Sequence, residues 1–520
     1  MLTTILDKIG EYNPQLFREL KGNIKKRNLI LTAIITIVLQ IMITSMFSQT
    51  DCLDYDQVNY ICRDSERIIE WQYLFRAFNY MLPLIAYIGG VYQLVADLSK
   101  EQTRGTLNFI RLTPQSSYKI LSGKILGTPI LIYLGIIACL PLHFLAGISS
   151  GMSLFWMLGI YTLWIAGGLL FSVIATFYTL LIGTQSKLSA ATTSVNGLGC
   201  VIAFVLGLPY IQMIDFAHEL YQQDPIYLDK FTWFLLPIAL NAFIGYLWLI
   251  ISVCTLTYFI WEAVNRRFNN PTTTPLSKIQ GYGLMSCFQL WLLGFVIPSY
   301  GGGIRSEHFG VALGFMFFAI PVSLLVLMVS ITPHRQTLLD WSRYRHKMNN
   351  PKNIWRDLLI GEKSPAILAI AVNALFTIVL WSSWVFLVPK EARFNIPDLS
   401  IFQVTISLVL TMGMALIYAL VIQLSLLMKT QKRSVFSIAI VCIVIITPLV
   451  LGGMFAAESF HIPLIWAFSP APILLFMEGG ISSVIFGFIG QILLLSSLTS
   501  KLQNKLKKAG ESETKAILTS

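Results

Sequence analysis

Long apolar stretches recur along almost the whole chain, from Leu29 to Leu498, and they limit the fold more than any other feature. A helix needs roughly 20 apolar residues to cross a bilayer core about 30 Å thick. Windows of that size predict twelve spans, at residues 29–47, 78–96, 126–145, 154–182, 191–211, 241–261, 281–298, 309–331, 365–388, 400–428, 435–455 and 479–499. We therefore predict an all-α polytopic membrane protein of about twelve transmembrane helices.

The charge content agrees with this class. Only 12% of the 520 residues are charged, which is about half the share found in soluble chains. This composition excludes a disordered chain, a disulfide-rich secreted domain and a cytosolic enzyme. Two further apolar stretches, 231–236 and 462–477, are interrupted by proline. We expect them to be short re-entrant or interfacial pieces rather than spanning helices.

The distribution of basic residues predicts the orientation. With twelve spans, 30 of the 37 Lys and Arg residues fall on the side of the two termini. Because cytoplasmic loops carry the excess of Lys and Arg, we predict cytoplasmic termini, in the plasma (inner) membrane if the chain is bacterial. The net charge of +11 then reflects topology, and we expect no nucleic-acid partner.

The chain also shows signs of an internal repeat. Thr184-Gln185 follows the fourth predicted span and Thr430-Gln431 follows the tenth, at an offset of 246 residues. We predict two six-span halves in parallel orientation. The predicted domains are a cytoplasmic amphipathic interface helix at 1–28, a first permease half at 29–270, a second half at 271–510 and a C-terminal tail at 511–520.

The cysteines and histidines carry few signals. Cys52 and Cys62 lie in one acidic loop predicted to face outside, where a disulfide and two free thiols are equally open. Patterns typical of metal ligands, such as CxxC or HExxH, are missing, so we predict no metal site. We expect loop histidines without partners near the outer face, namely His143, His218, His308 and His461.

Ionisable residues are almost missing from the interiors of the predicted spans. Asp97 and Glu262 lie at cytoplasmic span ends, where solvation suffices. An ion-coupled secondary carrier normally needs a charged residue inside a span, so that alternative is weakened. A membrane-embedded transferase is the other alternative. The residues that would serve it precede an apolar piece and also fit a solvated acidic loop: Asp215, His218, Glu219 and Asp224.

The phosphate-binding pattern GxxxxGK[ST] is absent from the sequence. We therefore predict a transport subunit rather than an enzyme, with no cofactor bound by this chain. If ATP drives the protein, another polypeptide hydrolyses it.

The first 28 residues include a predicted amphipathic helix between Asn13 and Asn28. Leu16, Phe17, Leu20 and Ile24 share one face, and Arg18, Lys21, Lys25 and Lys26 fill the other. Such a helix lies at a membrane surface or docks a partner.

The loop after the second predicted span reads EQTRGTL at residues 101–107, followed by Thr113-Pro114 and by Gly123-Lys124 before the third span. Over about residues 13–270, this pattern and the amphipathic helix resemble the ABC-2-type transporter permeases. The resemblance implies the membrane subunit of an ABC exporter, with ATP and Mg on a separate ATP-binding subunit. It implies these residues as candidates for contact with that subunit: Glu101, Arg104, Gly105, Thr106, Leu107, Pro114, Leu16, Phe17, Arg18 and Leu20.

The second half departs from this pattern. Its corresponding loop, residues 332–365, is basic and aromatic, and its candidate residues are Arg335, Trp341, Arg343, Arg345 and Glu362. Lipid headgroups and a second ATPase subunit are both possible ligands for such a loop. The scarcity of buried charge favours a lipid-like or other amphiphilic substrate. One chain could supply both halves, or two chains, as a homodimer or with a second permease, could pair.

Overall fold

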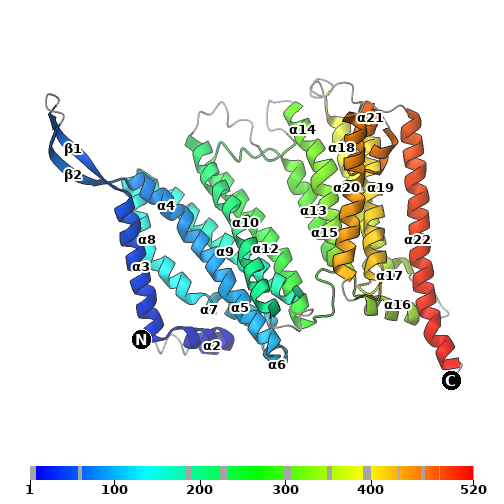
Figure 1. The fold of residues 1–520 in the computed structure, drawn as a ribbon, viewed down its shortest axis with the longest axis horizontal. Helices are drawn as coiled ribbons and strands as arrows, with labels where there is room; N and C mark the ends of the chain where they lie inside the picture. The colour runs from blue at the N-terminus through cyan, green and yellow to red at the C-terminus, as the bar shows by residue number, and fades with distance from the viewer. Residues whose placement is uncertain are drawn as a thin grey trace. The chain divides into compact units, whose positions relative to one another are not determined.

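The computed structural model describes residues 8–56, 61–182, 190–222, 232–297, 306–347, 354–389, 400–430, 433–457, 463–478 and 481–518. This part of the chain is helical apart from one two-stranded sheet. It divides into two compact units, Met1–Leu228 with Ala239–Pro271, and Asp229–Ile238 with Thr272–Ser520. The division after Pro271 lies beside the predicted junction of the two halves. Figure 1 shows the elements of each unit.

Ten helices within the described residues are long and apolar enough to cross a membrane. This finding confirms a helical, multi-pass membrane protein. The other two predicted spans coincide with the 17-residue helix α13 and with α20, which is apolar over Ala439–Gly452. The number of transmembrane spans and their orientation in a bilayer stay predictions.

The first unit contains these elements: α2 (Pro14–Asn23), α3 (Lys26–Met46), β1 (Ser48–Asp56), β2 (Ile61–Ile69), α4 (Trp71–Leu84), the π-helical turn η1 (Ile85–Gly89), α5 (Gly90–Thr103), α6 (Thr106–Arg111), α7 (Ser117–Gly127), α8 (Ile130–Ser149), α9 (Leu154–Ile182), α10 (Ala190–Gln222) and α12 (Ala242–Asn269). Buried apolar side chains of the helices from α3 to α12 form one continuous core. α2 lies across the start of α3, and the hairpin extends from the other end of α3 (Figure 1).

The hairpin of β1 and β2 carries the two cysteines of the acidic loop. The strands pair antiparallel, with Cys52 opposite Ser65 and Cys62 opposite Tyr55. The side chains of both cysteines lie outside the described residues, and so does the choice between a disulfide and two free thiols.

The second unit contains these elements: α13 (Lys278–Gly294), α14 (Ser306–Gly314), η2 (Phe315–Ala319, π-helical), α15 (Ile320–Ile331), α16 (Arg335–Lys347), α17 (Ile354–Ile360), α18 (Ile367–Leu387), α19 (Ile401–Leu426), α20 (Arg433–Ala457), η4 (Pro463–Phe468, a 3₁₀ helix), α21 (Leu474–Glu478) and α22 (Ile481–Leu518). α19 lies at the centre of this unit, because most of its side chains are buried. Ser277 and Ser400 begin α13 and α19 with reciprocal capping boxes.

The two proline-interrupted stretches do not form long helices where they are described. Residues 232–238 make a tight turn, and the backbone N–H of Phe234 donates to Gly294 O at the end of α13 (2.7 Å). The other stretch contains η4 and the five-residue α21. Both pieces are too short to cross a bilayer core by themselves.

A π-helical turn interrupts the second apolar helix of each unit, η1 between α4 and α5 and η2 between α14 and α15. In η1, Tyr87 is buried and its hydroxyl donates to Trp164 O (3.2 Å). Gly167 leaves room for that hydroxyl, since a Cβ there would lie 2.6 Å from it. π-helical turns are rare in proteins overall, but where they occur they often lie at functional sites.

Candidate functional site

The candidate site lies at one end of the first unit, where α2 packs along α7. Asn13 begins α2: its Oδ1 accepts from the backbone N–H of Leu16 (3.0 Å), and Pro14 occupies the first turn. The same side chain donates to Lys119 O of α7 (2.8 Å). At the other end of α2, Asn23 donates to Gly127 O (3.3 Å). Two asparagines therefore fix α2 against α7 at both ends.

Two glycines of α7 allow this close approach. A Cβ on Gly123 would lie 2.7 Å from the backbone nitrogen of Leu16, and one on Gly127 would lie 2.5 Å from Glu19 Cβ. The glycines are four residues apart, so they share one face of the helix. This face brings the backbones together, as small residues do between membrane helices.

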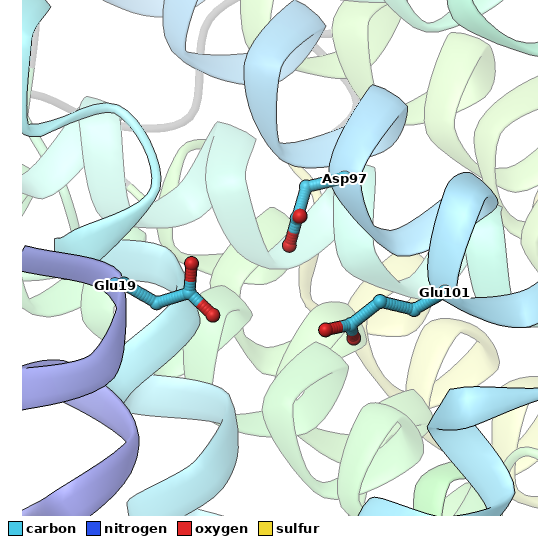
Figure 2. Close-up of side chains that lie close together, drawn as sticks. All are labelled: Glu19, Asp97 and Glu101. Carbon is cyan, nitrogen blue, oxygen red and sulfur yellow. The ribbon is translucent and has the colours of Figure 1, made fainter. Parts of the chain in front are cut away.

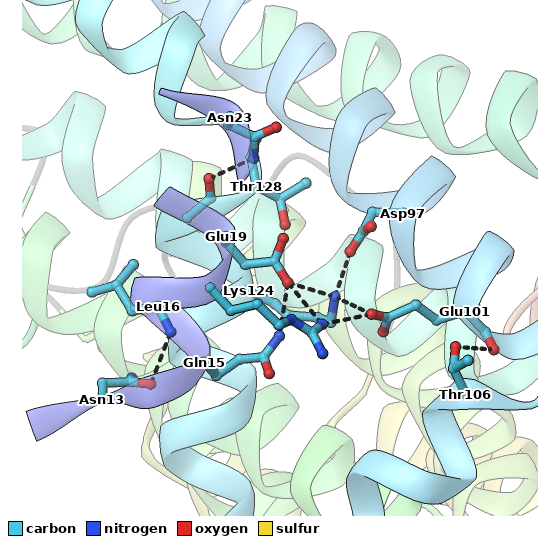
Figure 3. A network of polar contacts seen from close by, with 12 residues as sticks. Asn13, Gln15, Leu16, Glu19, Asn23, Asp97, Glu101, Thr106, Lys124 and Thr128 are labelled. Atoms are coloured by element: carbon cyan, nitrogen blue, oxygen red, sulfur yellow. Dashed lines mark hydrogen bonds and ion pairs between the residues drawn. The ribbon is translucent and has the colours of Figure 1, made fainter. Parts of the chain in front are cut away.

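An ion cluster joins α2, α5 and α7 beside this contact (Figure 3). Lys124 of α7 is only 1% exposed, and its Nζ lies 2.5 Å from Asp97 Oδ2, 2.9 Å from Glu101 Oε1 and 3.1 Å from Glu19 Oε1. Arg18 adds contacts to Glu101 (2.8 Å) and Glu19 (3.1 Å). We call these five residues the Lys124 cluster.

The charges of the Lys124 cluster stabilise one another. Burial by itself lowers the pKa of Lys124, but the three carboxylates outweigh it and raise the pKa overall. Burial likewise opposes the charge of Arg18, and Glu19 and Glu101 raise its pKa above the ordinary value. Both cations are therefore held in the charged form, which keeps the three helices joined.

Glu19, Asp97 and Glu101 point toward a common centre, as Figure 2 shows. Their nearest oxygens lie within 4.8 Å of one another, a spacing that could hold a metal ion. The Nζ of Lys124 contacts all three carboxylates, so an ammonium group already provides the positive charge there. The arrangement therefore fits an internal ion cluster better than a metal site.

The short helix α6 extends the cluster toward solvent. Gly105 has φ of +75°, a conformation that favours glycine, and it turns the chain out of α5. Thr106 then donates to Glu101 O (3.1 Å), while Leu107 is buried. On the outer side, Phe109 is 74% exposed and Leu112 is 84% exposed. α6 and its C-cap residue Leu112 therefore present two exposed apolar side chains next to the Lys124 cluster.

The other end of α7 is attached to α12. Tyr118 donates to Glu262 Oε1 (2.6 Å), and this hydrogen bond to the carboxylate raises the pKa of Tyr118. Ser117 donates to Asn265 Oδ1. α7 is therefore held by α2 and α5 along its length and by α12 at its start.

The structure brings most of the sequence-predicted residues of the first unit together here. Glu101 and Arg18 pair within the Lys124 cluster and Leu20 is buried, while Arg104 and Pro114 are exposed. Sequence reasoning placed Asp97 at a solvated span end and did not connect Glu19 and Lys124 to it. One local signal existed, because Asp97 and Glu101 are four residues apart and share a helical face.

The predicted residues of the second unit are largely engaged within it. Arg335 donates to Leu427 O (3.0 Å), and Trp341 donates to Asp357 Oδ2 (2.5 Å). Arg343 pairs with Asp340 (3.1 Å), and Arg345 pairs with Asp357 (3.5 Å). Glu362 is exposed.

The expectation of loop histidines without partners is wrong for His143 and His308. His308 lies in α14 and has an interaction partner. His143 is fully buried inside α8, with its Nδ1 2.9 Å from Tyr161 Oη, and its ring stacks on Phe75. Asp215, one of the candidate transferase residues, accepts a hydrogen bond from Tyr80 (2.7 Å). The side chains of the other three, His218, Glu219 and Asp224, lie outside the described residues, as does His461.

Comparison with known proteins identifies no relative: no family model, curated protein or solved structure matches this chain.

Proposed function

We propose that this chain is the membrane-spanning permease subunit of an ATP-driven exporter of a lipid-like or other amphiphilic substrate. A separate polypeptide supplies the ATPase, with its ATP and Mg. The observation that carries the proposal is the exposed apolar pair Phe109, on α6, and Leu112, its C-cap residue. Both lie outside the apolar helices, next to the Lys124 cluster.

The position of α6 favours a soluble partner. α4, η1 and α5 run continuously over Trp71–Thr103, 33 residues, or about 50 Å of helix. A bilayer core is about 30 Å thick, so this helix is longer than the core. The charged residues Asp97, Lys100 and Glu101 lie in its last two turns, so we place the excess length at the α5 end. α6 follows that end directly. Exposed apolar side chains in this position are typical of a protein-docking surface.

The contacts also suggest how movement would pass inward. A partner that displaces α6 pulls on Glu101, because Thr106 is bonded to its carbonyl and Lys124 to its carboxylate. The same cluster contains Glu19 of α2 and Asp97 of α5. The displacement would thus reach α3 through α2 and the long helix through α5, as one rigid group.

The test is ATP hydrolysis by the complex purified from its native host through a tag on this chain. We expect a co-purified chain with an ATP-binding motif and measurable hydrolysis. The double variant Phe109→Ser/Leu112→Ser removes the exposed apolar pair and should weaken the contact by about 2 kcal/mol, or about 30-fold in Kd. The matched control Tyr344→Ser, which changes an exposed aromatic residue on the second unit, should retain hydrolysis.

Two results would contradict the proposal. One is a purified chain that transports substrate with no ATP-binding subunit present. The other is full ATPase association of the Phe109→Ser/Leu112→Ser variant. Both variants change exposed side chains, so the amount of chain in the membrane fraction should stay the same and serves as the folding control.

The second candidate function is an ion-coupled carrier, and His143 favours it. An ionisable residue buried inside an apolar helix is expensive and often functional. Substrate transport that survives ATP depletion but is lost in His143→Gln and retained in His334→Gln would favour the carrier over the exporter; His334 is exposed, outside the apolar helices.

A further inference from the structure

The helix α17 of the second unit carries an apolar surface that its unit does not cover. Trp355 is 67% exposed, Ile354 at the start of the helix is 39% exposed, and Ile360 at its end is 46% exposed. Within the described residues, no side chain of α17 is fully buried. Because large apolar side chains are costly in water, this surface needs an occupant.

Hydrogen bonds fix the position of α17 along the helices of its unit. Lys278, the first residue of α13, donates from Nζ to Leu358 O (2.6 Å). Tyr282, one turn further into α13, donates to Leu359 O (2.9 Å). α17 therefore lies level with the first turn of α13, whose apolar run begins there.

The chain after α17 supports the same position. Ser364 donates to Asp357 O (2.6 Å) and also contacts Gly361 O (2.9 Å), which closes a compact turn. The apolar helix α18 begins at Ile367, seven residues after α17 ends. α17 thus lies between the starts of two apolar helices, at the level expected for the bilayer interface.

Two basic side chains next to this surface remain available. Arg356 and Lys363 are both exposed, and neither makes an ion pair with any residue that the structure describes. Arg343 and Arg345, by contrast, are paired with Asp340 and Asp357. An indole with free cations around it matches the chemistry of a phospholipid headgroup region, where tryptophan and basic residues gather.

We propose that α17 is an interfacial lipid-binding helix, in which Trp355 and its apolar neighbours enter the headgroup region while Arg356 and Lys363 bind the phosphates of anionic phospholipids. This site differs from α6, which follows a helix extending beyond the bilayer core. The proposal rests on the membrane class of the chain and not on the ATPase partner.

The first test identifies what touches α17 in cell membranes. A photo-crosslinking residue is placed by the substitution Trp355→p-benzoylphenylalanine, and adducts are analysed by mass spectrometry. We expect an increase of one phospholipid mass. The same substitution at Leu387, exposed on α18, is the positive control for lipid adducts. A protein adduct at position 355, or no adduct where Leu387 gives one, would overturn the proposal.

The second test measures headgroup preference. The purified chain is exchanged into an equimolar mixture of phosphatidylglycerol and phosphatidylcholine, and retained lipid is counted by native mass spectrometry. We expect enrichment of phosphatidylglycerol, reduced roughly fivefold for each cation removed in Arg356→Gln/Lys363→Gln. The control Lys507→Gln/Lys508→Gln removes two exposed charges of α22 and should change little. Equal loss in both double variants, or no enrichment, would refute headgroup binding by α17.

Discussion

Replacing Lys124 tests whether the Lys124 cluster holds α2, α5 and α7 together. Lys124→Met keeps most of the side-chain volume and removes the charge that contacts Glu19, Asp97 and Glu101. Arg18 still contacts Glu19 and Glu101, but the variant leaves three carboxylates close together with one cation. Because the Lys124 side chain is 1% exposed, water does not replace its charge readily.

The expected loss of stability depends on how the variant compensates for the missing charge. Removing one partner of a buried ion cluster costs about 3–5 kcal/mol. The cost has a ceiling, because one carboxylate can take up a proton, which costs about 4–5 kcal/mol at pH 7.5 for an ordinary pKa near 4. We therefore expect a loss of about 3–4 kcal/mol at pH 7.5. At pH 5 protonation is cheaper, and the loss should shrink by about 2 kcal/mol.

The assay is thermal or denaturant unfolding of the purified protein in mild detergent at both pH values. Lys119→Met is the matched control, since Lys119 is exposed on the same helix and contacts the ring of Tyr12; it should cost about 1 kcal/mol or less. Adding Asp97→Asn to Lys124→Met should restore part of the loss. A Lys124→Met variant that loses no more stability than Lys119→Met at either pH would refute the reasoning.

Three further predictions concern topology, packing and pH. A reporter active only outside the cytoplasm should stay silent when fused after Ser520; a strong signal would contradict the predicted orientation. Gly127→Leu should separate α2 from α7, because even its Cβ would lie 2.5 Å from Glu19 Cβ, and protease cleavage between α2 and α3 should become faster than in Gly22→Leu, where the space is open. Burial lowers the pKa of Lys278 to about 8, although Asp357 opposes this, so the folded state releases this proton before the unfolded chain does. The free energy of unfolding should therefore rise between pH 8 and 10.5, by up to about 3 kcal/mol, and Lys278→Met should show a flatter profile over that range in denaturant titrations.

The sequence predicted the helical membrane class because the length of an apolar helix is a local property. The start of α2 could also be predicted from a local signal, because Asn13 and Pro14 are typical of a helix N-terminus. The Lys124 cluster could not be predicted from the sequence, because Glu19 and Lys124 are 105 residues apart and only tertiary packing brings them together. The expectation for His143 was wrong for a related reason. Its partner Tyr161 lies on the next helix, and apolar periodicity does not reveal a buried polar pair.

In the second unit, the sequence drew attention to the loop 332–365 but could not show which of its residues are exposed. Trp341 and Arg345 stood out by residue type, yet both contact Asp357. Composition cannot separate an arginine that pairs internally from one that faces solvent. Trp355 and Arg356 belong to the same basic and aromatic loop. The structure adds that both are exposed and that hydrogen bonds fix the position of α17.

The π-helical turn η1 sets the rotational phase of everything that follows it in α5. A helix advances about 100° per residue, so a one-residue change in the turn would rotate Asp97 and Glu101 by about that angle and move them along the axis by about 1.5 Å. Both carboxylates would then leave Lys124, which contacts them at 2.5 and 2.9 Å. The buried Tyr87 within η1 and the distant Lys124 cluster therefore constrain the same angle from opposite ends of α5. A rotation of α5 at one end would therefore displace the contacts at the other end, even if the helix does not bend.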